Sequence, residues 1–184
     1  MNWQIVRLDD VAATPWRNGG GVTRELLAWP GAQDWRVRMS VAQVTRDGPF
    51  SRFDGVQRWF AVLAGAGVRL RLDGAAHVLT QRSAPFVFDG AADTDCRLLA
   101  GPTQDFNLML RQCTGRMQRL QGRHAFGCGA GALVAVYGAG NAALLDVGGG
   151  QTQIAPQTLA WRILDAGGPV QVEAADALWM EIAP

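Results

Sequence analysis

Apolar and polar residues alternate along most of this chain in short segments, which is the pattern of β-strands with one buried face. In the segment 35–44 the apolar residues Trp35, Val37, Met39 and Val41 alternate with Arg36, Arg38, Ser40 and Ala42. Helical periodicity is nearly absent. The same reasoning predicts further strands at 3–8, 22–29, 57–63, 68–72, 85–88, 96–100, 106–111, 116–121, 132–137, 142–147, 158–164, 169–173 and 178–182.

Turn-forming residues separate nearly all of these segments. Asp73-Gly74 follows the alternating segment 68–72 and is typical of a tight hairpin turn. The 23 glycines of the chain serve many such turns. Many short strands at regular spacing indicate an all-β sandwich or barrel.

The amino-acid composition also changes along the chain. Residues up to about 112 hold most of the arginines and the polar motifs, whereas from about 127 onward the sequence is rich in Ala, Gly, Leu and Val with few charges. Each part has enough strands for a small antiparallel jelly-roll barrel. We therefore predict two barrels, tightly packed rather than flexibly linked, with the junction within 112–128 and the ligand pocket in the first.

Composition excludes several classes of function. The formal net charge is +1 without a block of like charge, which argues against a nucleic-acid partner. All 17 basic residues are arginine, so chemistry that needs a lysine, such as a Schiff base, is not available. No apolar run reaches the roughly 20 residues that span a membrane, and the N-terminus lacks a signal-peptide pattern. We expect a cytoplasmic protein without a membrane partner.

Metal and cysteine chemistry are not favoured either. The only histidines, His77 and His124, stand apart from each other and from any glutamate, whereas a metal site draws on several such ligands. Of the three cysteines, Cys128 lies between glycines and is expected to be the most exposed, but none has a base beside it. We predict no metal and no cofactor.

Three polar clusters remain as candidates for a site. The first spans 15–25 and contains three glycines after Asn18, the second spans 47–58, and the third spans 105–111. Glycines permit unusual backbone dihedrals and close approach to a ligand, although a simple hairpin would explain them equally. In the third cluster Asn107 alternates with apolar residues and must find hydrogen-bond partners or bind something; a solvent-facing edge is the alternative.

Taken in order, these clusters resemble the HutD/Ves family. The matching motifs are W-R-N-G-G-G-V-T-R-E at 16–25, Arg38 with Ser40 and Ala42, G-P-F-S-R-F-x-G-x-x-R at 48–58, L-x-G at 63–65 and D-F-N-L-M-x-R at 105–111. The resemblance implies a bicupin, a cupin-like double barrel, without the usual cupin metal ligands. It also implies an association with histidine utilisation, in which family members act as accessory or regulatory proteins.

The leading hypothesis is a non-enzymatic protein that binds a small carboxylate linked to histidine degradation: urocanate, formylglutamate or formate. An arginine inside the first barrel needs an anionic partner. For Arg38 that partner is either Glu25, in a structural ion pair, or the ligand. The residues expected at the site are Asn18, Thr23, Arg24, Glu25, Arg38, Ser40, Phe50, Ser51, Arg58 and Asn107.

Two other classes of function stay open. In one, the protein is a metal-independent, isomerase-like enzyme with Glu25 as general base and Arg38 or Arg58 stabilising an anionic intermediate. In the other, it is a structural protein whose second barrel serves packing or homodimer formation.

Overall fold

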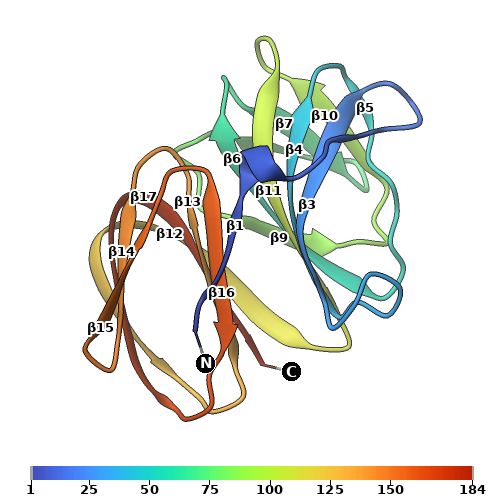
Figure 1. The fold of residues 1–184 in the computed structure, drawn as a ribbon. Helices are drawn as coiled ribbons and strands as arrows, with labels where there is room; N and C mark the ends of the chain where they lie inside the picture. Colours follow the sequence, from blue (N-terminus) through green and yellow to red (C-terminus); the bar gives the residue numbers. More distant parts are fainter. Residues whose placement is uncertain (1, 184) are drawn as a thin grey trace. The chain divides into compact units, whose positions relative to one another are not determined.

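The computed structural model describes residues 2–183 and confirms the expected all-β, cupin-like double barrel (Figure 1). One compact unit comprises Val11–Gln112, and the other comprises the residues up to Asp10 together with those from Cys113 onward. A single turn of 3-10 helix, η1 (Leu8–Asp10), is the only helical element in the described chain. No helix among these residues is long and apolar enough to cross a membrane.

The first unit contains two antiparallel sheets. The larger has the strand order β2 (Thr14–Pro15), β3 (Gly21–Trp29), β4 (Val37–Val44), β11 (Thr103–Arg111), β6 (Val56–Ala64) and β9 (Phe86–Asp89). The smaller has the order β5 (Gly48–Pro49), β10 (Thr94–Leu98), β7 (Val68–Leu72) and β8 (Ala75–Leu79). Apolar side chains of both sheets form one buried cluster, so the sheets face each other. Its members include Val44, Phe60, Val62, Leu70, Phe88 and Cys96.

The second unit is built around one long strand, β17 (Gly168–Ala183), that changes partners along its length. Its first half pairs with β14 (Ala143–Val147), and its second half pairs with β13 (Leu133–Gly138). On its other side it pairs with β12 (Thr114–Cys128). Strands β15 (Gly150–Ile154), β16 (Thr158–Ile163) and β1 (Gln4–Arg7) complete the sheet. This interior is filled by apolar side chains, among them Trp179, whose ring stacks on Phe126 at a centroid distance of 4.5 Å.

The observed boundaries differ from the predicted ones in three places. The first strand, β1, pairs with β16 in the second unit, although the division at residue 112 assigned it to the first. The boundary between the units falls between Gln112 and Cys113, at the start of the segment 112–128, and the rest of that segment forms β12, which pairs with β17. Strands β2, β5, β8 and β15 were not predicted, and the segments 169–173 and 178–182 belong to one continuous strand.

A candidate anion-binding pocket in the first barrel

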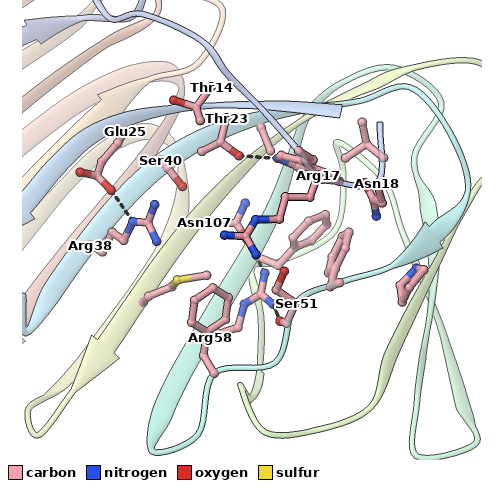
Figure 2. Close-up of a pocket in the computed structure, with 18 of the residues that line it drawn as sticks. Thr14, Arg17, Asn18, Thr23, Glu25, Arg38, Ser40, Ser51, Arg58 and Asn107 are labelled. Carbon is pink, nitrogen blue, oxygen red and sulfur yellow. Dashed lines mark hydrogen bonds and ion pairs between the residues drawn. The ribbon is translucent and has the colours of Figure 1, made fainter. Parts of the chain in front are cut away.

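The first unit holds a cavity of about 740 Å³ on the inner face of its larger sheet (Figure 2). Strands β3, β4, β6 and β11 contribute its floor, and the segments 14–18 and 49–53 contribute its walls. Strand register explains which side chains meet there. Glu25 lies opposite Ser40, and Ser40 lies opposite Asn107, on three neighbouring strands. Because side chains alternate along a strand, these three point to the same face of the sheet.

Arg38 and Arg58 belong to the next row of the same face. Both lie opposite Met109 of β11, Arg38 from β4 and Arg58 from β6. All three side chains line the cavity. The pairing of strands thus brings two arginines, far apart in the sequence, to one surface.

The Arg58 guanidinium is the most deeply placed charge of the pocket, with 5% of the residue exposed. It donates to Asn107 Oδ1 at 3.0 Å and to the Ser51 carbonyl at 3.3 Å. The rings of Phe50 and Phe88 lie 5.3 and 5.0 Å from its Cζ, in range for cation–π attraction. These neighbours solvate the cation, but none of them neutralises it.

No carboxylate pairs with Arg58 among the described residues, and its buried Nε has no hydrogen-bond partner. Burial, together with the nearby positive charge of Arg38, lowers the pKa of Arg58 to about 10. Burying a guanidinium that has no counter-charge and one N–H without an acceptor costs free energy. An anion in the cavity would supply both the missing negative charge and the missing acceptor.

Arg38 has a different environment. Its Nε donates to Glu25 Oε2 at 2.5 Å, and both side chains are partly exposed. Of the two partners considered for Arg38, the structure therefore contains Glu25. This places Glu25 in an ion pair, while its Oε1 makes no hydrogen bond within the described chain.

The glycine cluster forms the hairpin between β2 and β3. Gly19 has a φ of 68°, and the Gly20 N–H donates to Asn18 Oδ1 at 2.9 Å, which closes the turn. A Cβ on Gly21 would lie 2.4 Å from the Gln43 carbonyl oxygen, so this position packs against β4. The indole Nε1 of Trp16 donates to Thr23 Oγ1 at 2.7 Å. The glycines are thus required by the hairpin and its packing, and the hairpin carries its side chains to the pocket wall.

The structure brings nine of the ten predicted site residues together around this cavity. Arg24 is the exception: its Nε donates to the Val11 carbonyl at 3.0 Å, and its side chain does not line the pocket. Alternation along β3 explains this, because Thr23 and Glu25 point to one face and Arg24 points to the other.

Sequence reasoning missed several lining residues. Arg17 lies beside Asn18 in the same motif, is exposed and lines the pocket, as Figure 2 shows. Met109 follows Asn107 at the spacing of two that places it on the same face, so alternation would have found it. The aromatic lining residues Trp16, Phe53 and Phe60 lay within or near the recognised motifs but were not singled out.

The described residues contain no cluster of metal-ligating side chains, and two of the three cysteines are buried. No three His, Cys, Asp or Glu side chains among residues 2–183 lie close enough to hold a metal ion. The expectation that Cys128 is the most exposed cysteine was wrong: the residue is 5% exposed, whereas Cys113 is half-buried. Burial raises the pKa of Cys96 to about 12 and that of Cys128 to about 11, which leaves both as inert thiols at neutral pH.

Comparison with known proteins gives a family match over nearly the whole chain, because the HutD family model matches residues 8–180. A Pseudomonas putida protein described as lying in the hutC 3′ region is 38% identical over 108 residues, 58% of this chain and 57% of that protein. Protein Ves of Escherichia fergusonii is 38% identical over 99 residues, which cover 52% of this chain and 51% of the Ves protein. The alignments therefore span little more than half the length of these relatives.

Among solved structures, that of HutD from Pseudomonas fluorescens, which is described with the words "formate condition", matches with a TM-score of 0.88 at 28% identity. The match covers 99% of this chain and 98% of that one. Oxalate decarboxylase of Lactobacillus farciminis matches with a TM-score of 0.66 at 7% identity, over 99% of this chain and 86% of that one. The second likeness shows the shared fold alone.

Proposed function

Because the chain belongs to the HutD family, we propose that its first barrel binds a small carboxylate and that the protein acts as an accessory or regulatory protein rather than as an enzyme. Candidate ligands are the carboxylates of histidine degradation: urocanate, formylglutamate and formate. The residues proposed to form the site are Arg58 and Asn107 at the floor, Arg38, Glu25 and Ser40 along the sheet, and Asn18, Thr23, Phe50 and Ser51 around them.

The observation that carries this proposal is the state of Arg58. Its guanidinium is buried, faces the cavity, and has neither a carboxylate partner nor an acceptor for Nε among the described residues. A planar guanidinium matches the planar carboxylate, which can accept two hydrogen bonds from it. Asn107 and the Ser51 carbonyl hold the fork in place, so little side-chain entropy is lost when an anion binds.

The pocket also has the composition of a small-molecule site. Phe50, Phe53 and Phe60 supply apolar walls, while Ser40 and Asn107 supply polar groups at the floor. The volume of about 740 Å³ is ample for each of the three candidate acids. The related Pseudomonas fluorescens HutD, described as a formate condition, adds support for a small carboxylate.

A thermal-shift experiment with formate, urocanate and formylglutamate tests the proposal. A ligand present at about 100 times its Kd should stabilise the folded protein by about 2.7 kcal/mol. We expect at least one acid to raise the Tm of the wild type, and we expect this rise to vanish in Arg58→Met.

Arg69→Met is the matched control. Arg69 is exposed on β7 and does not line the pocket, so this variant loses the same charge and should keep the ligand response. A wild type that responds to none of the three acids would contradict the proposal. A response that survives in Arg58→Met would contradict the assigned site.

A further inference from the structure

We propose that the pocket recognises two ends of an elongated ligand: an anionic group at Arg58, and an N–H donor beside an oxygen atom at the Arg38–Glu25 pair. An amide group and an α-amino acid head group both carry this second chemistry. The inference rests on the proposed function, because it takes the anion at Arg58 as the first point of contact.

The two points of contact lie on different strands of one sheet. In the order β3, β4, β11, β6, Glu25 stands on the first strand, Arg38 on the second and Arg58 on the fourth. Adjacent strands are about 4.8 Å apart, so about 10 Å separates the backbones that carry the two arginines. Met109 occupies the strand between them and offers no charge. A ligand that reaches both ends therefore bridges side chains from strands two places apart in the sheet.

The ion pair still has hydrogen-bonding capacity. Arg38 uses its Nε for Glu25 Oε2, and its two Nη groups have no partner within the described residues. Glu25 keeps Oε1 as a free acceptor, and the neighbouring Ser40 hydroxyl also makes no hydrogen bond there. Donors and an acceptor thus stand side by side at the cavity. They complement a ligand that presents an oxygen to Arg38 and an N–H to Glu25.

Charge argues against a second carboxylate standing alone at this end. Glu25 already neutralises Arg38, and a bare carboxylate would approach Glu25 as well. The ligand carboxylate and the Glu25 carboxylate would repel each other, and this repulsion is stronger in a partly desolvated pocket than in water. A ligand with an N–H at this end meets Glu25 as an acceptor instead.

Four acids that share the butyrate chain separate these possibilities by calorimetry. Butyrate carries only the first anionic group, and glutarate adds a second carboxylate. Glutaramate adds a primary amide, and glutamate adds an amino acid head group. We expect glutaramate or glutamate to bind the wild type about tenfold more tightly than glutarate, since one hydrogen bond to a charged group is worth about that factor. Whichever of the two binds more tightly identifies the head group.

The Glu25→Gln variant provides the decisive contrast. It removes one negative charge, so, measured relative to butyrate, glutarate should bind more tightly and the N–H ligand should bind about tenfold less tightly. Such a reversal cannot arise from general damage to the fold. Asp34→Asn removes the same charge from an exposed loop position outside the pocket and should leave all four affinities unchanged.

The outcomes also separate this inference from the proposed function. Butyrate that binds through Arg58, together with four equal affinities or with glutarate as the tightest ligand, would overturn the inference alone. If Glu25→Gln changed the affinities of all four acids by the same factor, that result would also overturn the inference alone. Failure of all four acids to bind, together with no response to formate, urocanate or formylglutamate, would overturn the proposed function and the inference with it.

Discussion

Replacement of Asp105 by asparagine is expected to stabilise the protein increasingly as the pH rises. Asp105 is completely buried in β11, and its Oδ1 has no hydrogen-bond partner among the described residues. Thr103 Oγ1 donates to Oδ2 at 2.8 Å. Burial raises the pKa of Asp105 to about 7, and the bond from Thr103 offsets only part of that rise.

The direction of the pH effect follows from this rise. The unfolded chain loses the Asp105 proton near pH 3.9, whereas the folded protein keeps it until about pH 7. Between these values the folded state binds more protons, so the free energy of unfolding falls as the pH rises. The asparagine side chain of the variant cannot ionise. Urea unfolding of both proteins should show the variant gaining about 4 kcal/mol relative to the wild type between about pH 4 and pH 8.

The pH dependence of the difference between the two proteins is the critical quantity. Asparagine differs from a protonated aspartic acid in its donors, so the two proteins need not be equally stable at low pH. That offset is independent of pH. A difference that stays constant from about pH 4 to pH 8 would contradict a buried carboxyl group that ionises only near pH 7.

The second large effect is expected in the ligand-free protein when Arg58 is replaced by methionine. Methionine keeps much of the side-chain volume and places no charge among Phe50, Phe53 and Phe88. Replacing a buried charge with an apolar residue of similar size is often stabilising. We expect Arg58→Met to raise the free energy of unfolding by about 1–3 kcal/mol in chemical denaturation without ligand.

The reason for expecting a gain is that Arg58 has no carboxylate partner to lose among the described residues. Asn107 Oδ1 would be left without its donor, which reduces the gain. A stabilised protein that no longer responds to acids would show that the arginine is kept for binding at the expense of stability. Strong destabilisation by Arg58→Met would instead mean that the guanidinium is a structural centre of the first barrel.

Much of the fold could be predicted because alternation is a local signal. The predicted segments 22–29, 57–63 and 68–72 agree with β3, β6 and β7 to within one residue at each end. Strand β8 was missed because Ala75-Ala76-His77 carries no alternation. The long strand β12 was predicted only over 116–121, and the predicted segment stops just before Gly122, whose φ of 83° marks an irregularity in the pairing with β17.

The pairing of strands that are far apart in the sequence could not be predicted. Nothing in the residues 4–7 indicates that they pair with β16, more than 150 positions away. The site was accessible only in part for the same reason. Motifs and alternation collected Arg38, Ser40, Arg58 and Asn107, but they could not say which arginine has a carboxylate partner. That distinction depends on strand order, because Glu25 reaches the neighbouring strand and not the fourth one.

The most direct test of an anion site at Arg58 is to follow the arginine Nε–H signals by NMR while formate is added. The chain has 17 arginines and no lysine, and Arg58→Met assigns the signal of interest by its loss. Because Nε of Arg58 lacks an acceptor in the described structure, its signal should move saturably with formate while that of Arg69 stays unchanged. An Arg58 signal that does not move, or that moves only in parallel with exposed arginines, would contradict the assignment of this pocket as an anion-binding site.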